Sequence, residues 1–364
     1  PALLAPVRLR ASRAPGRPPE RAAAGAIVVA LAGNPNSGKT TLFNNLTGAR
    51  QHVGNYPGVT VERREGFRRF QGKDLVLVDL PGTYSLTAHS LDELVARNVI
   101  INEKPDIIVN ILDAANLERN LYLAVQLLEL ERPVVLALNM ADVAEKMGLA
   151  IDDALLGRKL GIAVVRTVGN RNQGTEDLLR TVIAAAADIR RPFRMDYGPR
   201  IEAGIGRVSE QLAALAEVKY PLRWLAIKLL ENDQDVRRAV GCLPGGGQVL
   251  ASAEEARAAL KAELGDDLEL AMAESRYRFV SEIYRAIVAA PGEMPPTRSD
   301  SIDRILTHRL LGLPIFFGVM WLLFNFVFTL GAYPQDWIEQ GIRLLVNALG
   351  SHMGESDLKS LVVD

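Results

Sequence analysis

The chain has 364 residues, of which 42 are lysine or arginine and 43 are aspartate or glutamate, so its formal net charge is −1. Its length allows roughly two or three domains, and the balanced charge gives no reason to expect nucleic acid as a partner. The single cysteine, Cys242, excludes a disulfide framework and a metal site made of several cysteines.

Residues 1–25 are rich in arginine, proline and alanine. A segment of this composition buries too little apolar surface to offset its ordering entropy, so we predict a disordered basic arm. It contains no apolar core of the length that a secretory signal needs.

A phosphate-binding loop follows the first apolar run, at 27–31. Residues 33–40 read GNPNSGKT and match the pattern G-x-x-x-x-G-K-[ST]. Its glycines let backbone N–H groups face phosphate oxygens; Lys39 would bridge the β- and γ-phosphates, and the Thr40 hydroxyl would bind Mg²⁺. A glycine-rich turn that matches by chance is the alternative. The candidate nucleotide contacts are Gly33, Asn34, Pro35, Asn36, Ser37, Gly38, Lys39, Thr40 and Thr41.

Short apolar runs alternate with helical stretches from 26 to 190. The runs at 76–79, 107–112, 134–138 and 163–167 are typical of buried strands, and those at 91–101, 117–130 and 153–160 of helices. This alternation predicts an α/β fold in which helices cover both faces of a mostly parallel sheet. Ligands of such sheets bind at the carboxyl ends of the strands.

A second motif ends the strand predicted at 76–79. The segment LVLVDLPG places Asp79 where it can hold Mg²⁺, usually through water, and Gly82 where its N–H can approach the γ-phosphate. Leu80 and Pro81 complete this Asp-x-x-Gly segment. The next residue is Thr83 rather than the glutamine that often positions the attacking water, so we expect slow intrinsic hydrolysis.

A third motif selects the base. The strand predicted at 134–138 ends in Asn139, Met140, Ala141 and Asp142. The Asp142 carboxylate can accept hydrogen bonds from N1–H and the 2-amino group of guanine, whereas adenine lacks this donor pair. Asn139 would bridge back to the phosphate loop. The alternative is an asparagine that caps the next helix, with Asp142 solvated.

Two further segments are candidates with open alternatives. The loop at 167–172 would place Val168, Gly169 and Asn170 against the guanine O6, but an ordinary strand-to-helix loop fits equally well. Residues 51–64 occupy the place of a first switch, an irregular mobile loop in which Thr60 would bind Mg²⁺ and sense the γ-phosphate. An ordinary threonine before a strand is the alternative there. The other candidate contacts beside Thr60 are Gly58, Val59, Val61 and Glu62.

Helical patterns replace the strands after a linker at 191–198. Residues 199–216, 221–231, 252–264 and 268–290 have helical periodicity, with a break at 243–248, and predict a small all-α domain over 199–290. A second linker at 291–309 precedes an uncharged stretch at 310–333, long enough for one transmembrane helix. The arginines before that stretch place the preceding residues in the cytoplasm. Residues 334–364 would form an interfacial or periplasmic segment, with an amphipathic helix at 337–349.

These residues together resemble the ferrous iron transport protein B (FeoB) family. The similarity is carried by GNPNSGKTTLFNNLTG at 33–48, VGNYPGVTVERREG at 53–66, VDLPGTYSLT at 78–87, ILDAANLERNLYL at 111–123, ALNMADVAEK at 137–146, RWLAIKLLEND at 223–233 and DRILTHRLLGLPIFF at 303–317.

The resemblance implies a P-loop GTPase of the TRAFAC type with GTP or GDP as ligand, then a helical domain that inhibits nucleotide release. A bacterial inner-membrane region that moves Fe²⁺ would follow, and its later helices lie outside this chain. Asn36 would hold K⁺ in place of an arginine finger, and the catalytic set would be Lys39, Asn36, Thr60 and Gly82. Small cytoplasmic Feo accessory proteins and a second copy of the chain are further partners that the resemblance allows.

A soluble-type regulatory GTPase, such as a ribosome-assembly factor, is the alternative function. Its apolar C-terminal stretch would then only dock to a membrane or a partner. No RNA-binding module or basic aromatic patch follows the GTPase motifs, and a long uncharged stretch does. The sequence therefore favours the transporter.

Overall fold

The structure is a computed structural model that describes residues 25–48, 51–56, 59–87, 90–188, 193–215, 218, 220–265, 267–289, 306 and 312–352. All but the last residue of the predicted arm at 1–25, most of the linker at 291–309 and residues 353–364 lie outside the described residues, as does Gly58. The chain divides into two compact units, residues 1–292 and residues 293–364.

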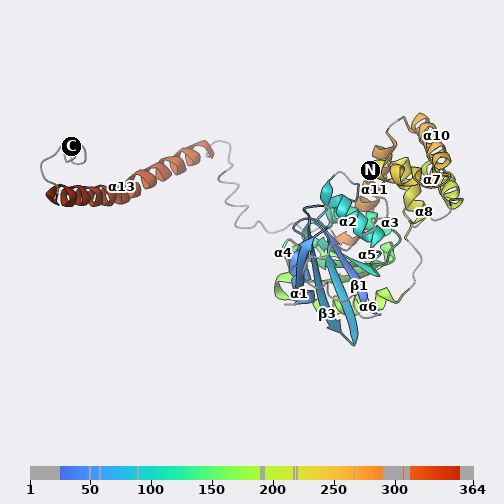
Figure 1. Ribbon diagram of the computed structural model, residues 1–364, viewed down its shortest axis with the longest axis horizontal. Coiled ribbons are helices and arrows are strands. Elements are labelled where there is room, and N and C mark those ends of the chain that lie inside the picture. Colours follow the sequence, from blue (N-terminus) through green and yellow to red (C-terminus); the bar gives the residue numbers. More distant parts are fainter. Residues whose placement is uncertain are drawn as a thin grey trace. The chain divides into compact units, whose positions relative to one another are not determined.

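A seven-stranded sheet in the order β2-β3-β4-β1-β5-β6-β8 forms the centre of the first unit (Figure 1). Its parallel part joins β4, β1, β5, β6 and β8, and β2 and β3 add an antiparallel edge. The mostly parallel sheet predicted from the sequence is therefore confirmed. The loop after β1 lies where the strand order reverses, which is the usual ligand site of such sheets. The strands are β1 (Ile27–Gly33), β2 (Gln51–Asn55), β3 (Glu62–Phe70), β4 (Lys73–Asp79), β5 (Ile107–Asp113), β6 (Val134–Asn139) and β8 (Ala163–Arg166).

Helices cover both faces of this sheet because its central strands are apolar on both sides. Val29 and Leu31 of β1 pack in one core cluster with side chains of α1 and α6, whereas Ala30 and Ala32 pack in a second cluster with α2, α3 and α5. This alternation follows from the two-residue period of a strand. The helices are α1 (Lys39–Thr47), α2 (Leu91–Asn102), α3 (Leu117–Glu129), α4 (Ala141–Lys146), α5 (Asp153–Leu160) and α6 (Thr175–Ala186).

The segment at 51–64, predicted as an irregular mobile loop, is mostly a hairpin. β2 pairs with β3, and only residues 56–61 connect the two strands. Tyr56 N donates to Val61 O (2.9 Å) and Val59 N donates to Tyr56 O (3.2 Å), which closes the connection. The sequence of β3, ERREGFRRF, lacks an apolar alternation because most of its residues are only partly buried, and the strand is held by backbone pairing with β2 and β4.

Among the residues that the structure describes, five helices follow, as α7 (Pro199–Ala213), α8 (Leu222–Leu230), α9 (Gln234–Gly241), α10 (Gly246–Leu264) and α11 (Leu268–Ile287). The sequence reading missed α9, a short helix that buries only Val236 and Val240 and is capped by the carboxylate of Asp233. It also placed the start of α10 too late, because the glycines from Gly246 are helical and the break is shorter than 243–248. The residues after α11 form β9 (Val288–Ala289), which pairs with β7 (Ala150–Ile151) rather than extending the helix.

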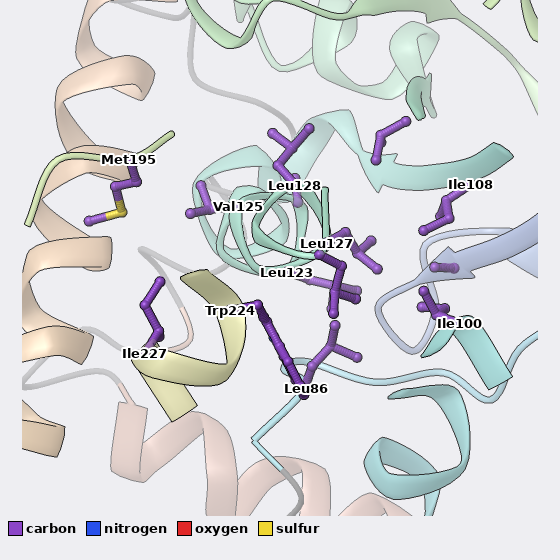
Figure 2. Packing of buried hydrophobic residues seen from close by; sticks show 14 of the residues in the cluster. Leu86, Ile100, Ile108, Leu123, Val125, Leu127, Leu128, Met195, Trp224 and Ile227 are labelled. Atoms are coloured by element: carbon purple, nitrogen blue, oxygen red, sulfur yellow. The ribbon is translucent and has the colours of Figure 1, made fainter. Parts of the chain in front are cut away.

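These helices share a core with the sheet (Figure 2). Trp224 and Ile227 of α8 belong to the same buried cluster as Leu123 and Leu127 of α3. Met195, in the predicted linker, is 2 % exposed and packs there as well. The residues of this linker that the structure describes, 193–198, are irregular but partly buried, so they fasten the two parts together.

A buried ion network also joins the two parts. Arg276 of α11 donates to both oxygens of Glu129 on α3 (3.1 and 3.0 Å) and also to Glu231. Lys228 Nζ lies 2.7 Å from Glu231 Oε2, and the hydroxyl of Tyr197 donates to Glu129. Burial alone would raise the pKa of Glu231, but Lys228 and Arg276 together lower it to about 2.

The second unit contains α13 (Gly312–His352), a single helix of 41 residues. Residues 312–329 are long and apolar enough to cross a membrane by length and composition. The separate helix predicted at 337–349 is wrong, because α13 continues through Pro334. A proline removes one intrahelical hydrogen bond, whereas ending the helix there would leave several backbone groups without intrahelical partners.

Candidate functional site

The phosphate loop is shaped by backbone conformations that few residues adopt. Gly38, directly before α1, has a φ of +82°, and a Cβ there would lie 2.2 Å from the Asn139 side chain. Asn36 also has a positive φ, of +67°. Pro35 and Asn36 are exposed on the outside of the loop, whereas Asn34 and Ser37 are buried under it. The predicted loop therefore has the curled shape and the open face that phosphate binding requires.

Lys39 and Asp79 form an ion pair at the carboxyl ends of β1 and β4. The two strands are neighbours, with Leu31 opposite Asp79, so the motifs at 33–40 and 79–82 meet at this edge. Burial raises the pKa of Asp79, and the neighbouring Lys39 opposes this rise. Thr83 N donates to Gly33 O (3.2 Å), and a Cβ on Gly82 would lie 3.4 Å from Pro35 Cα. The segment after Asp79 thus runs beside the phosphate loop.

Asn139 links three segments of the site. Its Nδ2 donates to Ser37 O in the phosphate loop (2.9 Å), and its Oδ1 accepts from Gly169 N (3.0 Å) and from the Thr167 hydroxyl (3.2 Å). The predicted bridge from Asn139 to the phosphate loop is present. The capping alternative does not describe these contacts, since α4 makes no side-chain cap hydrogen bond.

Asp142 lies three residues after Asn139, in the first turn of α4. Met140, which precedes this helix, has a φ of +58°. Its carboxylate is mostly buried and faces two cations at longer range, Arg171 at 3.8 Å and Lys146 at 3.9 Å. Both cations are themselves largely exposed. A carboxylate in this position has acceptor capacity left for a ligand with two N–H donors.

The loop at 167–172 comes to the site through Gly169. Asn45 of α1 donates to Gly169 O (2.7 Å), so this loop is held from two sides. A Cβ on Gly169 would lie 3.4 Å from both Asn139 and Thr41, which explains a small residue there. Val168 is buried and bridges to Gln173, while Asn170 is exposed. Thr167 and Asn45 were not predicted as site residues. Each makes one hydrogen bond, to the Asn139 side chain and to the Gly169 backbone respectively, and no sequence motif marks such contacts.

Thr60 is exposed in the connection between β2 and β3, with Val59 and Val61 partly buried beside it. The carboxylate of Glu62 forms an ion pair with Arg64 at 2.8 Å, and both side chains are partly exposed. The sequence reading missed Tyr56, whose hydroxyl donates to Asp79 O (3.2 Å) while its ring is buried. Tyr56 ties the start of this connection to the strand end that carries Asp79.

The donor set fits Mg²⁺. Hydroxyl and carboxylate oxygens are its preferred ligands, and it usually binds through few protein groups, phosphates and water. Thr40 is exposed directly after Lys39, and Asp79 lies beside that lysine. Within the described part of the chain no group of three or more His, Cys, Asp or Glu residues forms a metal cluster. A metal here would therefore depend on the nucleotide for most of its ligands.

Comparison with known proteins agrees with this geometry. A family model described as ferrous iron transport protein B matches residues 27–182, and one described as the FeoB cytosolic helical domain matches residues 197–289. The cytosolic domain of the T. maritima FeoB iron transporter in a GDP form is 34% identical, with a TM-score of 0.64, over 72% of this chain and 98% of that one. The same domain has been solved with GMPPNP, at the same identity and TM-score.

Two curated relatives are longer than this chain. The Fe(2+) transporter FeoB of Methanocaldococcus jannaschii is 44% identical over 338 residues, which are 92% of this chain and 50% of that protein. A fusion of Fe(2+) transport protein A with FeoB from Porphyromonas gingivalis is 41% identical over 346 residues, 93% of this chain and 41% of that protein. The chain thus spans half or less of the length of these relatives.

Proposed function

The chain belongs to the ferrous iron transport protein B family, and we propose that it binds GTP and slowly hydrolyses it to GDP and phosphate as the cytoplasmic part of a Fe²⁺ transporter. One observation carries the nucleotide assignment. Asn139 donates to Ser37 O in the phosphate loop and accepts from Gly169 N, which supports a single nucleotide site with Lys39 at its phosphate end and Asp142 at its base end. The solved relatives in GDP and GMPPNP forms support the same ligand class.

In the proposed reaction, Lys39 stabilises the negative charge that develops on the transferred phosphoryl group. Mg²⁺, held by Thr40, Asp79 and Thr60 together with phosphate oxygens, would neutralise that charge further. The Gly82 N–H would donate to the γ-phosphate, a role supported by the course of the segment 80–83 beside the loop. Lys39 pairs with Asp79 in the structure. A bound phosphate would compete with this carboxylate for the lysine, and Asp79 would then be available to the metal.

We also propose that GTP hydrolysis is slow and that K⁺ stimulates it. Thr83 stands where a water-positioning glutamine is common, and its side chain is buried rather than aimed at solvent. Asn36 is exposed on the rim of the loop with a positive φ, so its amide oxygen is free to take a monovalent cation. A cation there would supply positive charge beside the transferred phosphoryl group, which is the role of an arginine finger in other GTPases.

We further propose that the helical part slows nucleotide release. Arg97 of α2, which follows the Asp79 segment, donates to Asp233 (2.6 Å) and Asp235 (3.1 Å) at the start of α9. Replacing it by Arg97→Met should speed dissociation of fluorescent GDP several-fold, with Arg207→Met, at an exposed arginine of α7, as the matched control. Equal rates in both variants would contradict this role.

The apolar part of α13 would anchor the chain in a bacterial inner membrane, with the GTPase in the cytoplasm. Small Feo accessory proteins and a second copy remain candidate partners of the full protein.

The decisive experiment is Fe²⁺ uptake by the full-length protein with Lys39→Ala. The variant should lose GTP binding and uptake together. Lys73→Ala is the control, because Lys73 is an exposed lysine at the opposite end of β4 from Asp79. Uptake at the parental rate in a Lys39→Ala protein that no longer binds GTP would refute the link between nucleotide and transport.

A further inference from the structure

Arg166 is the last residue of the edge strand β8, directly before the guanine loop (residues 167–172). Its guanidinium donates to the Ile151 carbonyl of β7 at 2.6 Å. It also donates to both carboxylate oxygens of Asp153 (3.1 and 3.2 Å) and lies 3.5 Å from a carboxylate oxygen of Glu145. A guanidinium carries five donors in a fixed fork, so one side chain can hold a carbonyl and carboxylates together. Arg166 thus joins the start of the guanine loop to β7, to the start of α5 and to α4.

The strand that receives Arg166 also pairs with the end of the helical part. β7 pairs with β9, the two-residue strand directly after α11. The Asp152 N–H, one residue beyond β7, donates to the Ile287 carbonyl at the end of α11 (2.8 Å). Ile151 is 8 % exposed and belongs to the same buried cluster as Ile283 and Ile287. We call β7, β9 and the hydrogen bond from Asp152 to Ile287 the clasp, because they fasten the end of α11 to the GTPase part.

Both elements that would contact the guanine base lead to this clasp. Asp142 lies in α4, which is the element before β7 in the chain. The guanine loop bonds to Asn139 through Gly169 N, and Arg166 connects the start of the loop to β7. A base held between Asp142 and this loop would leave when the loop moves away from α4. The bonds of Arg166 to α4 and β7 oppose that movement.

We propose that Arg166 is a positioning residue that ties the guanine loop to the clasp, so that the end of the helical part slows nucleotide release at the base end of the site. Because the retained ligand is guanine nucleotide, this role rests on the proposed function. It differs from the role of Arg97, whose bonds to α9 act on the helix that follows the Asp79 segment. Coupling between two sites is reciprocal, so a bound nucleotide also stabilises the clasp.

The test measures dissociation of fluorescent GDP from the full chain in detergent, with Arg166→Met compared with Arg180→Met. Arg180 is the matched control, because it is an exposed arginine that also pairs with two carboxylates, both on its own helix α6. Arg166→Met should release GDP about fivefold faster than the parent, at the lower end of typical coupling between two sites. Arg180→Met should release it at the parental rate.

Two further measurements separate this role from a loss of folding. Exposed ion pairs contribute little to stability, so Arg166→Met and Arg180→Met should have similar melting temperatures. Arg166→Lys keeps the charge but replaces the fork by a single ammonium, so its GDP release should be slower than that of Arg166→Met and faster than that of the parent.

Hydrogen exchange at the Asp152 amide reports on the clasp itself. In the parent, GDP should slow this exchange about fivefold, whereas in Arg166→Met GDP should leave it unchanged. Without nucleotide, the amide should exchange faster in Arg166→Met than in Arg180→Met. Equal GDP release from these two variants, or full protection of Asp152 by GDP in Arg166→Met, would overturn the inference. A parent chain that binds no GDP would refute the proposed function instead, and exchange without nucleotide would still decide whether Arg166 holds the clasp.

Discussion

Arg276 is the residue whose removal should destabilise the first unit most. It is 1 % exposed, and both Glu129 and Glu231 depend on it for a counter-charge. In Arg276→Met, Glu231 would keep Lys228, whereas Glu129 would keep only the Tyr197 hydroxyl. The cost is therefore mainly that of one buried carboxylate without its cation, about 3–5 kcal/mol in the free energy of unfolding. For a unit of this size that lowers the melting temperature by roughly 10 °C.

The assay is thermal and urea unfolding of the full chain in detergent at pH 7, with Arg278→Met as the control. Arg278 is exposed on the same helix, so its replacement should cost less than about 0.5 kcal/mol. Adding Glu129→Gln to Arg276→Met should recover part of the loss, because it removes the stranded charge. A loss below about 1 kcal/mol for Arg276→Met, or one equal to that of the control, would refute this account of the network.

Four further predictions address the site and the ion network. Asp142→Asn should weaken GTP binding by about two orders of magnitude or more and favour xanthine nucleotides; unchanged GTP affinity in a competition assay would refute the guanine assignment. Replacing Na⁺ with K⁺ should raise phosphate release in the parent but not in Asn36→Ala, and equal stimulation of both would exclude Asn36 as the K⁺ ligand. Thr60→Ala should reduce hydrolysis more than GDP binding, measured by turnover and by calorimetry, whereas equal losses would indicate misfolding instead. Since the pKa of Glu231 is lowered from its ordinary 4.5 to about 2, its contribution to stability is full above pH 4.5 and lost as the pH falls toward 2; Glu231→Gln should flatten the stability curve in that window, and an unchanged slope would count against the shift.

The parts of the site that the sequence predicts well are those in which a residue type is needed at a fixed spacing. Lys39, Asp79 and Asn139 end or follow buried strands, and parallel strands bring such positions to one edge whatever the details of packing. The bridge from Asn139 to Ser37 could be predicted because the phosphate loop and the β6 end belong to that edge.

Other contacts leave no such trace in the sequence. One side-chain hydrogen bond joins the site to each of Tyr56, Thr167 and Asn45. Many polar residue types can make such a bond, so the residue type alone does not predict it. The hairpin at 51–70 escaped the sequence reading because β2 is exposed throughout and β3 is charged and mostly only partly buried, so neither strand shows an apolar period. The length of α13 escaped it because Pro334 predicts a break, and whether a helix ends at a proline depends on what surrounds it.

The helix α3 shows why the two predicted domains of the first unit behave as one body. Gln126 and Glu129 are three residues apart and therefore lie on the same side of the helix. Gln126 holds the Leu86 backbone of the GTPase part, and Glu129 holds Arg276 of α11. A displacement of α3 large enough to release one of these bonds also strains the other, since a helix moves as a rigid element over a single turn. The buried network at Arg276 and the segment after Asp79 are thus mechanically linked through one turn of one helix.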